Sequence, residues 1–211
     1  MMDHIEVLPH VTLDPSAPFG AAFLKKKVTT LIDAARYLKE MDYGHPPSRS
    51  LEDALEAGVG TCYHKHGILA SCAREVGVPV QKALGIYPMD SSLVPSVAAV
   101  LSSCGLSYVP ATHCFLVYGA YRVDLTEKNC NGKTGPIDSY FYIEIVPPDL
   151  SEDAEREIYR LFMEKEWLRF CGTEGAVGVG VGGKIDFNRA WTLLEKCGES
   201  MKLGIGCHLA R

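Results

Sequence analysis

The chain has 211 residues, of which 47% are hydrophobic and 22% are charged. This composition is typical of globular proteins and excludes the disordered and fibrous classes. The 26 acidic and 21 basic residues give a net charge of −5, which disfavours a surface that binds the phosphates of nucleic acids. A chain of this length buries a sizeable core without a metal or a disulfide. We therefore expect one domain over residues 1–211 with no nucleic-acid partner.

The first twenty residues lack the basic start and long apolar run of a secretory signal peptide. No apolar stretch approaches the roughly 18 residues that a membrane span requires. These features predict a cytoplasmic protein that does not associate with membranes. In that compartment the eight cysteines are expected to be reduced thiols, most of them buried.

Helical patterns fill the first part of the chain. Apolar residues at helical spacing predict a first helix over Ala21–Tyr43, ended by Gly44. Ser50 is the expected N-cap of a second, short helix that stops at Gly58. A third helix is predicted over Cys62–Val76, since Thr61 precedes it as an N-cap and glycine and proline come after it.

After Pro79 the pattern changes to that of strands. We predict four strands, over Val80–Tyr87, His113–Tyr118, Tyr121–Leu125 and Tyr140–Val146. The long connection over 88–112 is expected to hold a short helix around Val97–Ser103. Two further helices are predicted, over 149–170 and 186–203, with a Gly-rich stretch between them. Helices that precede a sheet indicate the α+β class, with a core at about 50–146 and a helical C-terminal extension at about 149–211.

Cys62 is a candidate nucleophile because it stands where a helix begins. The unpaired N–H groups and the positive end of the helix dipole favour a thiolate at that position. A nucleophilic cysteine also requires a base and a group that orients the base.

The segment from His113 to Thr126 supplies both groups. If Gly119 and Ala120 form a two-residue type II′ turn, Tyr118 pairs with Tyr121. Side chains alternate along strands, so His113 and Asp124 then share one face and lie diagonal to each other. The other face carries apolar residues, including Tyr121, and is the expected core face. A carboxylate at this place can hold one ring nitrogen of the histidine and leave the other for the thiol.

These segments resemble the transglutaminase-like superfamily, whose core is related to the papain-like cysteine proteases. The family pattern of Gly, Cys, Arg, Gly and Pro falls here on Gly60, Cys62, Arg74, Gly77 and Pro79. A histidine that opens one strand and an aspartate on the next are matched by His113 and Asp124. The resemblance implies a nucleophile helix packed on an antiparallel sheet, with Cys62 as nucleophile, His113 as base and Asp124 as orienting acid.

Three positions differ from the family pattern. His66 replaces the usual small residue four after the cysteine, Tyr121 replaces the tryptophan before the aspartate, and Asp124-Leu125-Thr126 lacks the common proline. His66 lies one helical turn from Cys62, and we expect it to form the wall of the site or to pack beneath it.

Metal and cofactor sites have weaker support. Cys62 and His66 have usable metal-ligand spacing, with His64 two residues from each, but the chain offers no second such pair. Gly178–Lys184 matches part of a phosphate-binding loop, but Ile185 stands where a Ser or Thr is required to hold Mg²⁺. We therefore predict neither a metal nor a cofactor.

The predicted function is a cysteine-dependent hydrolase or acyltransferase that cleaves a peptide-like amide in a peptide or protein through a thioester. Because water is always present, hydrolysis is favoured narrowly over amine transfer. The N–H of Cys62 is the expected first oxyanion donor, and Tyr43 and Tyr37 are candidates for the second. The alternative is an inactive module of the same fold that binds a protein or peptide.

Overall fold

The computed structural model of the chain describes residues 4–127, 129, 131–165, 180–181, 184–185, 192, 195–197 and 199. The described helices are η1 His4–Val7, α1 Pro18–Lys25, α2 Leu31–Glu40, α3 Leu51–Ala57, α4 Cys62–Glu75, η2 Pro95–Val97, α5 Ala98–Ser103 and α6 Glu152–Lys165. In this part of the chain no helix is long and apolar enough to cross a membrane.

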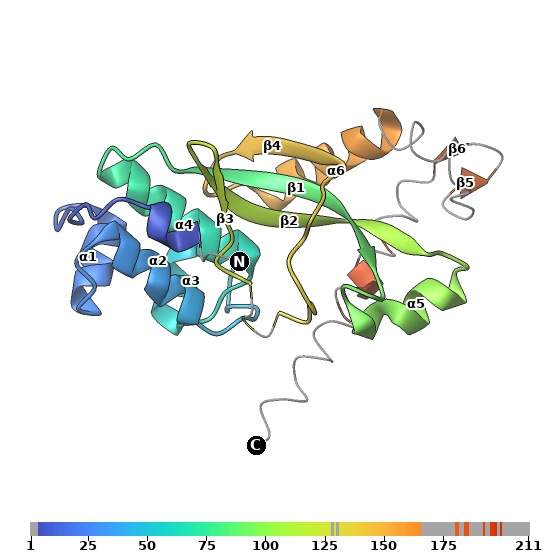
Figure 1. Cartoon of the computed structure of the whole chain (residues 1–211), viewed down its shortest axis with the longest axis horizontal. Helices are drawn as coiled ribbons and strands as arrows, with labels where there is room; N and C mark the ends of the chain where they lie inside the picture. Colours follow the sequence, from blue (N-terminus) through green and yellow to red (C-terminus); the bar gives the residue numbers. More distant parts are fainter. Residues whose placement is uncertain are drawn as a thin grey trace, which may run out of the picture. The chain divides into compact units, whose positions relative to one another are not determined.

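Strands β1 Gln81–Asp90, β2 Tyr108–Tyr118, β3 Tyr121–Val123 and β4 Tyr142–Val146 form one sheet in the order β3-β2-β1-β4 (Figure 1). Two short strands, β5 Gly180–Val181 and β6 Lys184–Ile185, pair with each other. The combination of helices with an antiparallel four-stranded sheet confirms the α+β class.

The chain divides into two compact units. The first contains residues 1–85, 113–129 and 143–150, and the second contains residues 86–112, 130–142 and 151–211. Helices α1 to α4 and the β2–β3 hairpin end lie in the first unit, whereas α5 and α6 lie in the second. The single domain expected over 1–211 stays a prediction.

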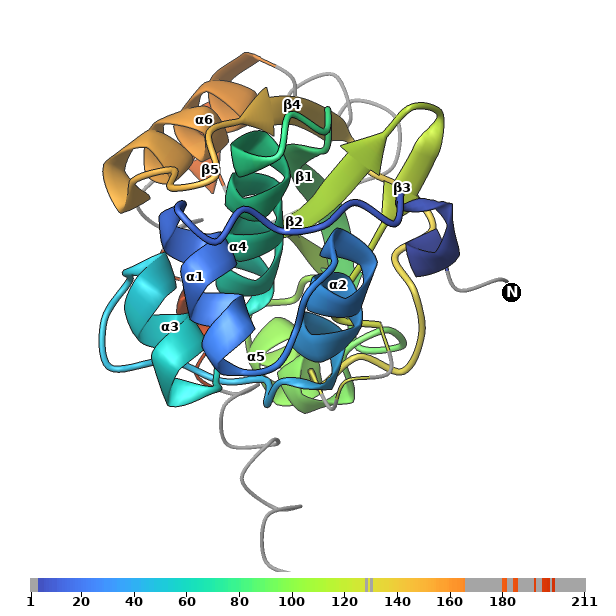
Figure 2. The same cartoon turned by 90° about the vertical axis from the view of Figure 1, so that its left-hand side faces the viewer.

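Helix α4 is the central element of the first unit. Every residue from Tyr63 to Ala73 is buried, although the segment includes two histidines, a lysine and a serine. Helices α1, α2 and α3 all pack against α4 (Figure 2). A helix that is covered on all sides must satisfy its polar side chains through contacts with the segments around it.

The single helix expected over Ala21–Tyr43 is wrong, because the structure has α1 and α2 in its place. Lys27 between them has a left-handed backbone, with φ of 63°. The hydroxyl of Thr30 then caps α2 by accepting a hydrogen bond from the N–H of Asp33 (3.3 Å). Apolar residues continue at helical spacing on both sides of this break, so hydrophobic periodicity alone does not reveal it.

The second and third predicted helices are confirmed as α3 and α4. The Ser50 hydroxyl accepts from the N–H of Asp53, and Gly58 ends α3 with a φ of 70°. Helix α4 begins at Cys62 and ends at Glu75, and Gly77 lies beyond its end with a φ of 70°. Glycine suits both positions because residues with a Cβ rarely adopt this conformation.

The hairpin has the predicted register. Tyr118 pairs with Tyr121 and Leu116 with Val123, around a turn in which Gly119 has a φ of 58°. The ladder ends at Val123, two residues earlier than predicted, whereas β2 begins five residues earlier, at Tyr108. The expected core face is wrong at Tyr121, which is exposed, and Phe115 on the opposite face is buried. Much of β2 is covered on both faces, so the alternation does not separate core from solvent.

The second unit has its own apolar cluster. Residues of β1, α5 and β2 meet in it, among them Tyr87, Leu101 and Val109. Tyr159 of α6 is fully buried and donates from its hydroxyl to the carbonyl of Pro110 (3.0 Å). The helix predicted around 97–103 is confirmed as α5, and α6 accounts for much of the one predicted over 149–170. Residues 166–170, most of Gly178–Lys184 and most of the helix predicted over 186–203 lie outside the described residues.

Gly67→Ala tests how closely α4 packs in the first unit. In an exposed helix this change stabilises by about 1 kcal/mol. At Gly67, however, a Cβ would lie 2.6 Å from the carbonyl oxygen of Pro148 and 2.9 Å from Leu51 Cδ2. Because the Pro148 oxygen belongs to the main chain, we expect the variant to lose about 1–3 kcal/mol of unfolding free energy in urea titrations.

Gly135→Ala is the matched control, since no heavy atom lies within 4 Å of its added Cβ. This variant should unfold at the wild-type urea concentration or slightly above it. A Gly67→Ala protein as stable as Gly135→Ala would contradict the described packing of α4.

Candidate active site

The segment before α4 places Cys62 at the helix start. Gly60 donates from its N–H to the carbonyl of Asp42 (3.0 Å) and accepts from the N–H of Gly44 (3.4 Å). A Cβ at Gly60 would approach Met41 Cε to 2.9 Å and His64 Cβ to 3.0 Å, so the approach requires glycine. Cys62 is the first residue of α4 and is half-buried. The helix dipole at this position favours the thiolate.

His113 and Asp124 form a hydrogen-bonded pair across the hairpin. Nε2 of His113 lies 2.7 Å from Oδ2 of Asp124, and the histidine is only 2% exposed. The other carboxylate oxygen accepts from the N–H and the hydroxyl of Thr126, at 2.8 and 2.7 Å. Both oxygens of Asp124 are therefore held, which orients the imidazole.

Charge and burial act in opposite directions on Asp124. Burial alone would raise the pKa of its carboxyl group, but the positive charge and the hydrogen bond of His113 outweigh it and hold that pKa well below its usual range. Asp124 is consequently ionised throughout the physiological pH range.

His66 connects the helix to the acid-bearing segment. The side chain is fully buried, with Nδ1 2.8 Å from the carbonyl oxygen of Cys62, and Leu125 donates from its N–H to Nε2 (2.8 Å). Since Nε2 accepts, the ring proton is on Nδ1 and is donated to Cys62. Nε2 also lies 3.4 Å from Oδ1 of Asp124. Both of these atoms are acceptors, so we do not regard this approach as an ion pair.

His64 caps the helix that carries Cys62. The N–H and the hydroxyl of Thr61 lie 3.3 and 3.0 Å from Nδ1 of His64, which places the ring proton on Nε2. Burial lowers the pKa of His64 to about 4, and the charges of Arg49 and Lys82 act in the same direction, against the opposing effect of Cys62. His64 is therefore neutral near pH 7.

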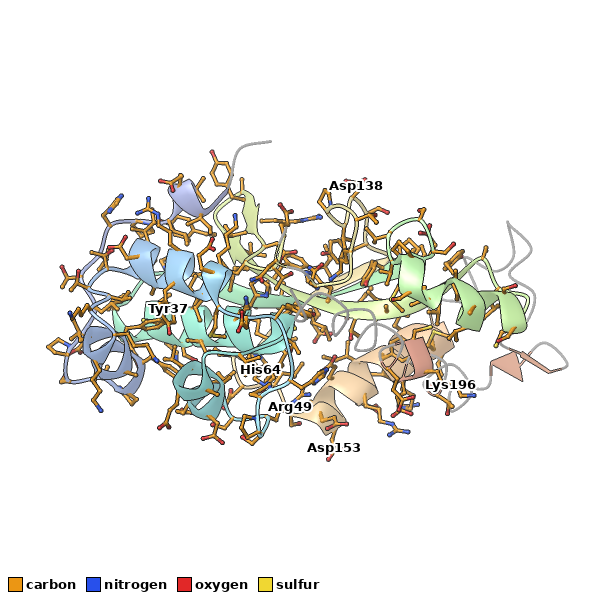
Figure 3. The ribbon with its side chains drawn as sticks, turned by 90° about the horizontal axis from the view of Figure 1, so that it is seen from below. Tyr37, Arg49, His64, Asp138, Asp153 and Lys196 are labelled. Atoms are coloured by element: carbon orange, nitrogen blue, oxygen red, sulfur yellow. The ribbon has the colours of Figure 1, made fainter. Side chains whose placement is uncertain are left out.

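Two cations enclose the ring of Tyr63, the residue after Cys62. Lys82 Nζ lies 3.7 Å from the ring centroid and Arg49 Cζ lies 4.0 Å from it. The same cations donate to the carbonyls of Pro148 (2.7 Å) and Leu150 (3.3 Å). Figure 3 labels Arg49 and His64, and the charge of Arg49 acts on the His64 ring. This arrangement joins the segment after β4 to the start of α4, and no motif in the sequence indicated it.

Lys65 and Asn129 bind the end of α2 behind the site. The Lys65 ammonium donates to the carbonyls of Met41 and Lys39, and the side-chain amide of Asn129 donates to the same two groups. Burial lowers the pKa of Lys65 to about 8, an effect opposed by Asp42, Glu40 and Asp124.

The two tyrosine candidates for the oxyanion donor lie in different places. The Tyr37 ring packs 5.9 Å from that of Phe23 and beneath Lys26 of the α1 end, apart from His64 at the start of α4 (Figure 3). Tyr37 as the second oxyanion donor, a candidate by residue type, stays a prediction. Tyr43 lies between Asp42 and Gly44, and the main chains of these two residues form hydrogen bonds with that of Gly60. The structure thus brings Tyr43 close to the helix start.

No group of three or more His, Cys, Asp or Glu side chains is arranged to hold a metal ion within the described residues. Of the metal candidates in the sequence, His66 uses both ring nitrogens for main-chain groups, and His64 accepts through Nδ1 from Thr61. Cys62 carries a reduced thiol.

The sequence model of the transglutaminase-like superfamily matches residues 19–116. Residues 19–116 are therefore similar to this superfamily. The match contains Cys62 and His113 and ends before Asp124. No curated protein and no solved structure matches the chain significantly. The transglutaminase-like superfamily includes cysteine-dependent enzymes.

The structure thus brings His113 and Asp124 into contact, and it connects Cys62 through His66 to Leu125, the residue after Asp124. That these residues act as nucleophile, base and acid stays a prediction. Sequence reasoning named His66 without its partners and missed Lys65, Lys82 and Arg49. A lysine in a helix or at a strand end ordinarily indicates solvent exposure, so the sequence carries no signal for their burial.

Lys65 should make stability depend on pH. Its pKa is about 8 in the folded chain against an ordinary value of 10.5, so between these pH values the unfolded chain binds the additional proton. The contribution of Lys65 to the unfolding free energy should therefore rise as the pH increases from about 8 to about 10.5. Lys65→Met removes this group while keeping an unbranched side chain that is one heavy atom shorter.

The measurement is the difference in unfolding free energy between wild type and Lys65→Met, from urea titrations at intervals between about pH 7 and pH 10.5. The difference should shift in favour of the wild type as the pH rises. A difference that stays constant over this range would show that Lys65 does not have a lowered pKa.

Proposed function

We propose that this protein is a cysteine-dependent hydrolase or acyltransferase that acts on peptide-like amides, with Cys62, His113 and Asp124 as its catalytic triad. The observation that carries the proposal is the 2.7 Å contact between His113 Nε2 and Asp124 Oδ2, joined through His66 to the first residue of a helix. Similarity of residues 19–116 to a superfamily that includes cysteine-dependent enzymes supports it.

The first half of the reaction forms an acyl-enzyme. The Cys62 thiolate attacks the amide carbonyl carbon, and a carbon–sulfur bond forms as the carbonyl oxygen takes up negative charge. The tetrahedral intermediate collapses with cleavage of the carbon–nitrogen bond. The His113 imidazolium gives its proton to the departing amine, which leaves a thioester on Cys62.

The second half releases the acyl group. Water or an amine attacks the thioester, His113 takes the proton of the attacking group, and Cys62 departs as the thiolate. Water gives a carboxylic acid and an amine gives a new amide. We favour hydrolysis because water reaches any open thioester.

Asp124 acts through His113. Since its carboxylate holds Nε2, proton exchange with the thiol and the substrate takes place at Nδ1. The pKa of Asp124 is lowered by its contact with His113, so the acid remains a carboxylate while the imidazolium forms and disappears.

The oxyanion requires donors at the start of α4. The N–H of Cys62 is the first, because it is at the N-terminal end of the helix. Tyr43 is the proposed second donor, supported by the bonds of its neighbours Asp42 and Gly44 to Gly60.

The rate of Cys62 modification by iodoacetamide against pH tests the thiolate–imidazolium pair. In the wild type we expect rapid modification well below about pH 8.5, the usual thiol pKa region, because His113 stabilises the thiolate. His113→Ala should slow modification at about pH 6 by about tenfold or more, since the thiol then titrates near 8.5. Peptide mass spectrometry locates the label.

Cys62→Ala is the control, because its tryptic map should lose the rapid label while the other thiols react as before. An ordinary thiol titration in the wild type, unchanged by His113→Ala, would refute the triad and favour the binding module.

Asp124→Asn tests the orienting acid. The amide keeps the size of the side chain but removes the negative charge that stabilises the imidazolium. With any amide substrate found by screening, kcat/KM should fall by about 10²–10⁴-fold, the range over which a positioned acid–base pair contributes. The steady-state rate against pH is the measurement.

Asp138→Asn provides a matched exposed control and should leave kcat/KM unchanged. An Asp124→Asn protein with wild-type kcat/KM would remove Asp124 from the mechanism.

A further inference from the structure

His66 belongs to the nucleophile helix α4 and contacts the segment that follows Asp124. It is fully buried, and its ring nitrogens contact main-chain groups of Cys62 and of Leu125, the residue after Asp124. On one side Nδ1–H donates to Cys62, and on the other Nε2 accepts from Leu125, each at 2.8 Å. The proposed reaction uses neither contact.

The sheet does not hold Asp124 by its ladder. The last paired residue of β3 is Val123, opposite Leu116, and β3 ends there. Asp124 is the next residue, so its main chain lies beyond the last pair. Its position depends on its own side-chain bond to His113 and on what binds the residues that come after it.

Leu125 and Thr126 both donate hydrogen bonds. Leu125 donates from its N–H to His66, and Thr126 donates to Oδ1 of Asp124 from its N–H and its hydroxyl. The Thr126 contacts are local, within two residues of Asp124. The contact from Leu125 to His66, in contrast, connects this segment to α4, an element far from it in the sequence.

The other side of the ring fixes the start of α4. The Cys62 carbonyl belongs to the first turn of the helix, and its oxygen accepts a hydrogen bond from Nδ1–H of His66. The ring also meets that of His113 edge to face, with centroids 6.1 Å apart and an interplanar angle of 82°. His66 thus contacts the main chain of the nucleophile, the ring of the base and the segment of the acid.

Only one form of His66 satisfies both contacts. A proton on Nδ1 is required for donation to Cys62, and a lone pair on Nε2 is required to accept from Leu125. In the other tautomer the proton is on Nε2 and would face the N–H of Leu125, which is also a donor. The bare Nδ1 would then face the carbonyl oxygen of Cys62, which is also an acceptor. The main-chain partners therefore select the Nδ1–H imidazole.

We propose that His66 is a positioning residue, which sets the separation of Cys62 from the His113–Asp124 pair by joining the helix to the residue after Asp124. This proposal rests on the proposed function. Loss of His66 should leave the thiol and the imidazole present but poorly placed, so the thiolate loses its stabilisation. Small displacements of this kind have large effects on reacting groups.

The test compares the pH profile of Cys62 alkylation by iodoacetamide in the wild type and His66→Leu. Leucine fills much of the volume but binds neither main-chain group. The alkylation rate at about pH 6 should fall about tenfold or more, with the inflection moved towards the unperturbed value of about 8.5.

His66→Asn and His66→Gln separate the two contacts. Asparagine places an amide donor near the position of Nδ1, and glutamine places an amide oxygen near the position of Nε2. Each variant should restore part of the wild-type rate. If His66→Leu does not fold, judged by circular dichroism, these two variants carry the test, and wild-type profiles in both would overturn the proposal.

Leu69→Ala is the structural control. Leu69 is fully buried in the same helix but makes neither main-chain contact of His66, and its truncation should lower stability. Its melting temperature should fall while its alkylation profile stays that of the wild type. If His66→Leu behaves like Leu69→Ala, His66 is only structural and the proposal fails.

A measurement on the wild type gives a second readout. The ¹⁵N shifts of the His66 ring should show the Nδ1–H tautomer, and the Nε2–H tautomer would overturn the proposal. The two proposals also fail differently. An ordinary thiol titration in the wild type refutes the triad, whereas a reactive wild-type thiol unchanged in His66→Leu refutes the role of His66 alone.

Discussion

A helix that is covered on every side needs internal partners for its polar side chains, and α4 is such a helix, in which Nε2 of His64 is the one buried side-chain atom without a partner among the described residues. Lys65 donates to the end of α2, and His66 binds the main chain of Cys62 and Leu125. His64 accepts from the residue that precedes the helix. An unmet buried polar group costs about 1–3 kcal/mol, so each partner is required once the helix is enclosed. The polar residues of α4 therefore specify which segments lie around Cys62.

The same constraint links the fold to the candidate chemistry. The contacts of Lys65, His66 and Lys82 reach main-chain carbonyl or N–H groups at segment ends, after α2, β3 and β4 respectively. Such ends have few ladder or helix bonds of their own, so side-chain contacts determine where they lie. The Cys62, His113 and Asp124 side chains belong to this first unit, within which the contacts are made. Stability of the unit and geometry of the site thus depend on the same bonds.

Local signals predicted the parts of the structure that depend on local conformation. Ser50 and Gly58 bound α3, and Thr61 and Gly77 bound α4. A glycine turn sets the hairpin register that places His113 diagonal to Asp124 on the same face. The break at Lys27 was missed because apolar spacing continues across it. The burial of Lys65 and Lys82 and the exposure of Tyr121 depend on tertiary neighbours, which no residue pattern in one sequence encodes. Residue type alone likewise could not separate Tyr43 from Tyr37.

Two departures from the family pattern are physically related. The position four after the cysteine is usually small and here is His66, and the segment Asp124-Leu125-Thr126 lacks the common proline. A proline after Asp124 would have no N–H and would leave Nε2 of His66 without the donor that it has in this structure. A small residue at position 66 would leave the N–H of Leu125 without its buried acceptor. Histidine at position 66 is thus favourable when a residue with an N–H follows Asp124, and the reverse also holds. Together they fix the segment after Asp124 by a hydrogen bond, whereas a proline there would fix it by restricting φ.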